Sequence, residues 1–137
     1  MSASADVIAL VRQWIAKAEE DLRTAEHTLT LKRRCPFATV CFHAQQCIEK
    51  YLKALLASLS IDFPKMHDLA ELVALLPSGY TIPLATAQME RLTDYATVSR
   101  YPGEREPLTR ADAKEAVALA RAARRAVRSY LPKDALT

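Results

Sequence analysis

Glycine is scarce in this chain, which has only two glycines among 137 residues. Turns between β-strands often require glycine, because other residues rarely adopt a positive φ. The scarcity argues against a β-rich fold with many tight turns, and against a glycine-rich loop that cradles phosphate. Alanine and leucine dominate the composition instead, and both favour helices. The composition therefore predicts an all-α fold.

The chain also lacks the patterns of a metal site, a secretion signal and a membrane span. Its three cysteines include no Cys-x-x-Cys pair and its three histidines are scattered, so we expect no metal ion and no cofactor. The N-terminus has no basic region followed by an apolar run, and no apolar stretch approaches ~20 residues. These absences predict a cytoplasmic protein with reduced thiols and no membrane contact.

Residues 36–59 have apolar side chains at steps of three and four, which is typical of a helix. The apolar arc covers about half the circumference, more than the ~100° stripe of a surface helix, so we predict a central helix that packs against two or three others. Gln45 falls inside this arc. Because a buried amide needs hydrogen-bond partners, we expect it to bond a loop backbone or a polar neighbour, or to contact a groove or subunit interface. Glu49 and Lys53, four residues apart, are expected on or beside the polar edge.

Further helices are predicted on either side of this central one, at residues 6–29, 67–76, 84–99 and from Thr109 to about residue 131. Trp14 lies on the apolar stripe of the first helix and is interpreted as a core anchor. Thr109 and Asp112 have the spacing of a capped helix start. Together these segments predict a single domain, residues 1–137, built as a helical bundle.

Positive charge is concentrated near the C-terminus. Residues 1–99 carry ten basic and eleven acidic side chains, a net charge of −1, whereas residues 100–137 carry nine and five, a net charge of +4. The last helix has an arginine stripe, formed by Arg121, Arg124, Arg125 and Arg128. Two interpretations stay open: a solvated edge whose arginine stems cover the core rim, or a groove for phosphate or an acidic partner. No aromatic residue interleaves with the stripe, so base stacking is not supported.

Several short motifs together resemble one known family. They are Ala18, Asp21-Leu22 and Ala25 in the first helix, Ala44-Gln45-Gln46-x-x-Glu49-Lys50-x-x-Lys53-Ala54-Leu55-Leu56 in the central helix, His67-Asp68-Leu69, and Arg100-Tyr101-Pro102 before an alanine-rich final helix. On these residues the chain resembles a HEPN domain of the small stand-alone prokaryotic kind. The match covers nearly the whole chain, and the Gln-Gln, Glu-Lys and Lys-Ala block is its specific part.

The resemblance implies an up-and-down bundle of four to five helices that usually forms a homodimer. HEPN proteins are commonly paired with a minimal nucleotidyltransferase in toxin–antitoxin-like modules, and a nucleotide-binding role has been proposed for them. Several HEPN toxins are metal-independent RNases with an Arg-x(4–6)-His motif. Here Arg23 precedes His27 by three intervening residues and Arg34 precedes His43 by eight. Because the motif is absent, we favour a binding protein over an enzyme.

The candidate ligand site combines residues from three motifs. We expect Arg100 and Tyr101 to bind a nucleotide or phosphate, with His67 and Lys50 or Lys53 as neighbours, because arginine holds phosphate bidentately and tyrosine can stack. One alternative makes Arg100-Tyr101-Pro102 a plain turn whose tyrosine packs on the bundle end. A second is an RNase toxin with a non-standard site of Arg100 and His67. A third is RNA or DNA binding through the arginine stripe.

Overall fold

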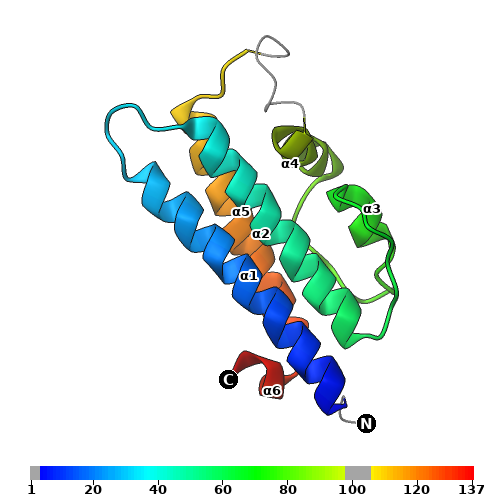
Figure 1. Ribbon diagram of the computed structural model, residues 1–137. Helices are drawn as coiled ribbons and strands as arrows, with labels where there is room; N and C mark the ends of the chain where they lie inside the picture. The colour runs from blue at the N-terminus through cyan, green and yellow to red at the C-terminus, as the bar shows by residue number, and fades with distance from the viewer. Residues whose placement is uncertain (1–3, 98–105) are drawn as a thin grey trace.

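The computed structural model describes residues 4–97 and 106–137, and all regular secondary structure within these two ranges is helical. The helices are α1 (Ala5–Leu29), α2 (Phe37–Ser58), α3 (Leu69–Ala74), α4 (Thr86–Thr97), α5 (Arg110–Tyr130) and α6 (Lys133–Leu136). The prediction of an all-α helical bundle is confirmed. Figure 1 shows α1, α2 and α5 as long helices side by side, with α3 and α4 on the other side of α2.

Helix α2 is the centre of the bundle, as its wide apolar arc predicts. It packs against α1, α5, α4 and α3, and its fully buried side chains include Ile48, Tyr51, Leu52, Leu55 and Leu56. The facing side of α5 is lined by small residues, among them Ala113, Ala116, Ala120 and Ala123. Small side chains let two helices approach closely, so α5 can lie directly against the bulky face of α2.

The helix starts follow local capping chemistry. Ser4 accepts a hydrogen bond from the backbone N–H of Val7 at 3.2 Å at the start of α1. Thr109 and Asp112 form a capping box at the start of α5, which confirms the capped start expected there and satisfies backbone donors that the helix leaves unpaired.

Two helices begin later than predicted. Helix α3 begins at Leu69 rather than at His67, because the Asp68 side chain accepts from the Glu71 backbone N–H at 3.0 Å and so acts as the N-cap. Helix α4 begins at Thr86 rather than at residue 84. Near its start, the Gln88 side chain accepts from the backbone N–H of Ala85 at 2.8 Å.

The short helix α6 was not predicted. It follows Pro132 and lies against the N-terminal half of α1, where the Arg12 guanidinium donates to the Asp134 carbonyl oxygen at 2.5 and 3.0 Å. A four-residue helix has too little periodicity to be recognised in sequence. In the described residues, no helix is both long and apolar enough to cross a membrane.

Candidate functional site

A strip of polar side chains runs along α2, a helix whose other residues are mostly buried. Its members are His43, Gln45, Gln46, Glu49, Lys50 and Lys53, and we call them the polar strip. At ~100° per residue they fall within one continuous arc of about 160°. Asp21 of α1 contacts one edge of the strip, and His67, from the segment before α3, contacts the other. The strip therefore lies where three parts of the chain meet.

The Glu49 carboxylate is the most connected group of the strip, although only 4% of its side chain is exposed. It accepts hydrogen bonds from Lys53 Nζ at 3.1 Å, His67 Nδ1 at 3.1 Å and Gln45 Nε2 at 3.2 Å. A carboxylate this deeply buried is costly unless it is paired and hydrogen-bonded. The surrounding donors offset that cost and hold the loop before α3 against α2.

Gln45 has the partners that its position in the apolar arc predicts. Its side-chain amide donates to the backbone carbonyl of His67 at 3.2 Å, and its carbonyl oxygen accepts from Gln46 Nε2 at 2.7 Å. The expectation of a loop backbone or polar neighbour is thus confirmed. The alternative, a contact in a groove or subunit interface, is not supported, because the Gln45 side chain is fully buried within the bundle.

The expected position of Glu49 and Lys53 at the polar edge was wrong. Their residues are only 3% and 6% exposed, because Trp14 of α1 and Phe63 cover the lysine. The Lys53 ammonium lies 5.6 Å from the centre of the Trp14 ring and 5.8 Å from that of Phe63. Both rings attract the cation through their electron-rich faces. The half-buried Trp14 is therefore both a packing residue and part of the environment of Lys53.

His67 is held by one ring nitrogen and leaves the other exposed. Since Nδ1 lies against the Glu49 carboxylate, a neutral imidazole carries its proton there and presents the lone pair of Nε2 to the outside. The side chain is 65% exposed. Among the described residues, nothing hydrogen-bonds to Nε2.

A second carboxylate repeats the arrangement at the other edge of the strip. Asp21 of α1, with 10% of its side chain exposed, accepts from His43 Nδ1 at 2.8 Å and from Lys50 Nζ at 2.5 Å. Each carboxylate thus holds one histidine and one lysine. We did not single out His43 from the sequence. The usable signal was its seven-residue spacing from Lys50, which places both on one helix face.

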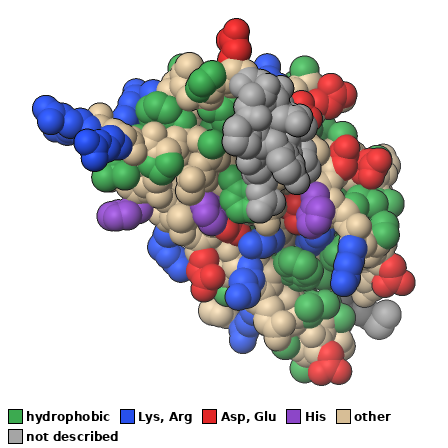
Figure 2. Space-filling view, turned by 45° about the horizontal axis from the view of Figure 1, so that its top comes forward, with side chains coloured by type: hydrophobic (Ala, Val, Ile, Leu, Met, Phe, Trp, Pro, Cys, Tyr) green, Lys and Arg blue, Asp and Glu red, His purple; other side chains and the backbone are tan. Residues whose placement is uncertain are grey.

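The polar strip and the two residues that contact it, Asp21 and His67, contain two carboxylates and two lysines, whose charges balance. Figure 2 shows a face of the molecule on which histidine side chains lie among lysine, arginine and acidic side chains. Within residues 4–97 and 106–137, no group of three or more histidine, cysteine or acidic side chains is placed to hold a metal ion.

The structure brings together three residues singled out from the sequence, namely Gln45, Lys53 and His67, around Glu49, whereas Lys50 contacts Asp21 at the other edge of the strip. Both lysines are engaged in ion pairs with carboxylates, a constraint that the sequence did not reveal. Arg100 and Tyr101, the proposed centre of the ligand site, lie outside the described residues.

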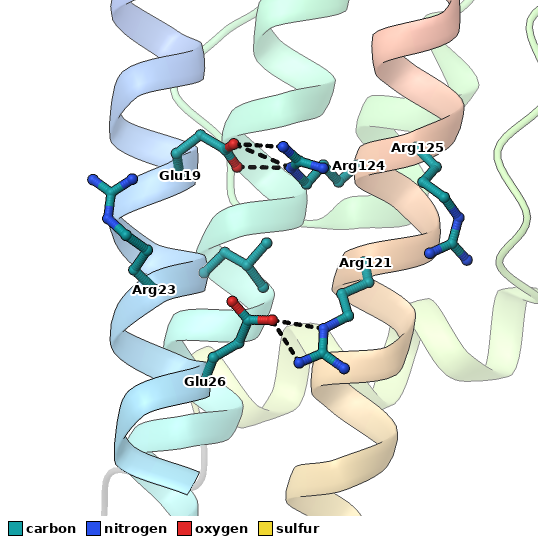
Figure 3. A pocket seen from close by; sticks show the side chains of 7 residues that line it. Glu19, Arg23, Glu26, Arg121, Arg124 and Arg125 are labelled. Carbon is teal, nitrogen blue, oxygen red and sulfur yellow. Dashed lines mark hydrogen bonds and ion pairs between the residues drawn. The ribbon is translucent and has the colours of Figure 1, made fainter. Parts of the chain in front are cut away.

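The arginine stripe lies on a different face of the bundle, between α5 and α1. Arg124 forms a forked contact with Glu19, with distances of 2.8 to 3.1 Å, and Arg121 donates to Glu26 at 2.6 Å. Figure 3 shows both pairs crossing from α5 to α1. Two of the four arginines are therefore ion-paired across helices, so the stripe is more than a solvated edge.

These pairs shift the proton affinities of their members. Partial burial raises the pKa of Glu19, but hydrogen bonds from Arg124 and Tyr51 and the charges of Arg124 and Arg128 outweigh it, so the net pKa is lowered. Burial raises the pKa of Tyr51 to about 12, opposed by its hydrogen bond with Arg128. The hydroxyl of Tyr51 accepts from Arg128 Nη1 at 3.4 Å.

Solved structures contain the same fold. The structure of TT1696 from Thermus thermophilus matches with a TM-score of 0.73 and 28% identity, over 88% of this chain and 98% of that one. ST0689, described as an archaeal HEPN homologue, matches with a TM-score of 0.67 and 29% identity, over 87% of this chain and 95% of that one. The search of functionally curated proteins gave no match. The family model of the HEPN domain matches residues 11–130, and the chain therefore belongs to the HEPN domain family.

Proposed function

We propose that this chain is a non-enzymatic, dimeric HEPN protein that binds a nucleotide or another phosphate-bearing ligand beside the polar strip. We further propose that it acts with a minimal nucleotidyltransferase in a toxin–antitoxin-like module. The observation that supports the ligand site is the fixed placement of His43, Lys50 and His67 around buried carboxylates. Their exposed side-chain fractions are 27%, 23% and 65%, respectively, so each can reach a ligand at the surface.

The carboxylates make this cluster suitable for phosphate. Asp21 and Glu49 fix their cationic and histidine partners before a ligand arrives, which reduces the conformational entropy that binding must overcome. Both acids are nearly buried, which limits their repulsion of an approaching anion. Charge-assisted hydrogen bonds from lysine or protonated histidine are among the stronger polar contacts. Arg100 and Tyr101 remain part of the proposed site.

Thermal unfolding of the purified chain with ATP, GTP, AMP or inorganic phosphate tests the ligand site. A bound ligand stabilises the folded state by RT ln(1 + [L]/Kd), so a saturating nucleotide should raise Tm by a few degrees, roughly 3–5 °C. The shift should be lost in Lys50→Gln and Arg100→Ala and kept in Lys133→Gln, a matched change at an exposed lysine. No shift with any of these compounds would exclude the proposed ligand site.

Two substitutions at His67 distinguish the roles of its two ring nitrogens. His67→Asn keeps a donor near Nδ1 for Glu49 but removes Nε2, whereas His67→Gln places an amide near the former Nε2 position. If Nε2 contacts the ligand, the Asn variant should lose the Tm shift while its stability without ligand stays close to that of the parent. Equal ligand shifts in the parent and the Asn variant would remove Nε2 from the site.

The partner and the dimer need separate measurements. Light scattering after size exclusion should give about twice the monomer mass of 15.2 kDa. Co-expression with a nucleotidyltransferase encoded by a neighbouring gene should yield a complex that elutes as one peak. Independent elution of the two proteins at micromolar concentration, or the lack of such a gene, would count against the pairing.

The Glu49–His67 contact favours one second candidate, a metal-independent RNase. A carboxylate that fixes the tautomer and direction of an imidazole is a common way to prepare a general base. In this reaction His67 Nε2 takes the proton of a ribose 2′-OH, the 2′-oxygen bonds to phosphorus, and the P–O5′ bond breaks. The leaving 5′-oxygen takes a proton from water, and Arg100 stabilises the phosphate. This function predicts cleavage of labelled RNA in EDTA with 2′,3′-cyclic phosphate ends, abolished in His67→Asn. Intact RNA after prolonged incubation with the dimer would eliminate this candidate.

A further inference from the structure

A groove of about 310 Å³ lies between α1 and α5 and is independent of the polar strip. Glu19 and Asp21 are two residues apart on α1, a step of about 200°, so the groove and the strip occupy nearly opposite sides of that helix. The charged residues that line the groove are Glu19, Arg23, Glu26, Arg121, Arg124 and Arg125. Four arginines and two glutamates give the groove a net charge of +2.

The two central arginines already show which chemistry the groove recognises. Arg124 binds the carboxylate of Glu19 in a forked arrangement, and Arg121 binds that of Glu26 through two nitrogens at 2.6 and 2.5 Å. The planar guanidinium fork fits a carboxylate with two parallel hydrogen bonds. The carboxylates of these pairs neutralise Arg121 and Arg124, and both ion pairs cross the groove from α5 to α1.

The other two arginines are left without partners. Arg23 of α1 and Arg125 of α5 are exposed, and neither makes a hydrogen bond or ion pair with any described residue. Figure 3 shows them on opposite rims, Arg23 on the outer side of α1 and Arg125 on the outer side of α5. One small anion does not bridge two groups that diverge in this way. A segment with carboxylates along both of its edges can satisfy both.

We propose that this groove is a docking site for an acidic helical segment of a partner protein. A helix with its side chains is about 10–12 Å wide, enough to lie along α1 and α5 and present carboxylates to both rims. Leu22 forms the apolar part of the lining, so charge supplies most of the attraction. Binding should therefore be modest in affinity and sensitive to salt.

Two features favour a protein segment over nucleic acid. None of the described residues that line the groove is aromatic, so these residues offer unpaired bases nothing to stack on. Glu19 and Glu26 already neutralise Arg124 and Arg121, so a continuous phosphate backbone would find free positive charge only at the two rims and not along the floor of the groove. A peptide can place its acidic residues only at the rims.

The test uses two fluorescein-labelled, alanine-rich helical peptides, one with glutamates on both edges and one with glutamine at every such position. Fluorescence anisotropy with the purified chain should show saturable binding of the glutamate peptide only. Its affinity should fall at least about tenfold between 50 and 300 mM NaCl. The variant Arg23→Gln/Arg125→Gln should weaken binding roughly tenfold. Because neither arginine has a described partner, its Tm should match that of the parent.

The matched control is Arg33→Gln/Arg34→Gln, which removes the same charge from the exposed loop after α1. It should leave the affinity within about twofold. Equal weakening in the two double variants would overturn the proposal, because the attraction would then be general rather than local. No binding, or equal binding of the glutamine peptide, would also overturn it. Tighter binding of a 20-nucleotide RNA, lost in the same groove variant, would assign the groove to nucleic acid instead.

Discussion

His67 Nδ1 lies 3.1 Å from Oε1 of Glu49, a carboxylate with only 4% of its side chain exposed, while the imidazole itself is 65% exposed. The pair thus connects a buried acid in the central helix to a ring at the surface. On the other side of Glu49, Lys53 is buried under Trp14 and Phe63. This combination makes Glu49 the residue whose loss should disturb both the core and the polar strip.

Replacing Glu49 by glutamine should destabilise the protein by about 3–5 kcal/mol, because Lys53 would remain buried without its counter-charge. Urea unfolding followed by circular dichroism measures the change. The double variant Glu49→Leu/Lys53→Met should recover at least half of that loss, since it removes both buried charges. Glu71→Gln, at an exposed position of α3, is the control and should stay within about 0.5 kcal/mol of the parent. A mild effect of Glu49→Gln would show that Lys53 reaches solvent.

Acidic pH should weaken the ion pair between Glu19 of α1 and Arg124 of α5. The pKa of Glu19 is lowered in the folded state below its ordinary value of 4.5, so its ionised form contributes stability above about pH 4.5. That contribution is lost as the pH falls through the folded-state pKa. Glu19→Gln should therefore cost roughly 1 kcal/mol at pH 7 and progressively less below pH 4.5. A difference between parent and variant that stays constant from pH 7 to pH 3 would contradict this assignment.

Alkaline pH should lower the stability of the fold through ionisation of Tyr51. Its pKa rises from 10.0 to about 12 in the folded protein, chiefly because the ring is buried. The protonated hydroxyl thus favours the folded state, and this stability is fully present below pH 10 and decreases as the pH rises toward 12. At pH 11 the Tyr51 hydroxyl should still be mainly protonated in the folded protein. In a spectrophotometric titration at this pH, the absorbance of ionised tyrosine should therefore be the same in Tyr51→Phe as in the parent. A clearly lower absorbance in the variant at pH 11 would mean that Tyr51 ionises at its ordinary pKa.

The three cysteines should differ in reactivity. Burial raises the pKa of Cys41 to about 12, and burial together with nearby acidic groups raises the pKa of Cys47 still further. Because the thiolate is the reactive form, both should resist a thiol reagent such as DTNB. Half-buried Cys35 donates a hydrogen bond to the Thr28 carbonyl at 3.3 Å. One thiol should react in the folded protein at pH 7.5 and three in urea. Reaction of Cys47 before unfolding would contradict the prediction.

The capping box of α5 gives a local stability test. Thr109→Ala removes the hydroxyl that accepts from the Asp112 backbone N–H at 3.2 Å, which should cost about 1 kcal/mol. Thermal unfolding should show a Tm lower by about 3–5 °C. Thr109→Ser keeps the hydroxyl and should be within about 1 °C of the parent. Equal Tm values for the Ala and Ser variants would mean that the box contributes nothing measurable.

Apolar periodicity was sufficient to predict the bundle. The long helices and the central place of α2 follow from side chains that recur every three or four residues, and the start of α5 follows from the spacing of Thr109 and Asp112. These signals are local, so they can be read along one helix at a time. The beginnings of α3 and α4 were missed by two residues, because more than one nearby residue could serve as a cap.

The candidate site was harder to predict because its contacts join separate helices. Charged residues are normally assigned to the solvent side, yet Asp21, Glu49 and Lys53 point inward, where they satisfy one another or a histidine. Glu19 and Glu26, seven residues apart, face Arg124 and Arg121. That complementarity shows only when two helices are aligned, so a pattern read along a single helix reveals the arginine stripe but not its partners.

The C-terminal helices α5 and α6 pack on helices from the start of the chain, so the bundle cannot be completed until synthesis is nearly finished. Arg12 and Asp134 are 122 positions apart, and α5, which packs on the first two helices, is also made late. While a ribosome is still producing residues 60–109, α1 and α2 can already pair, but the face of α2 that α5 will cover remains open to water. This half-built state exposes apolar surface and is prone to aggregation. A slow-translating stretch between α2 and α5 should therefore lower the soluble yield, and a chaperone that shields hairpin-like intermediates should raise it.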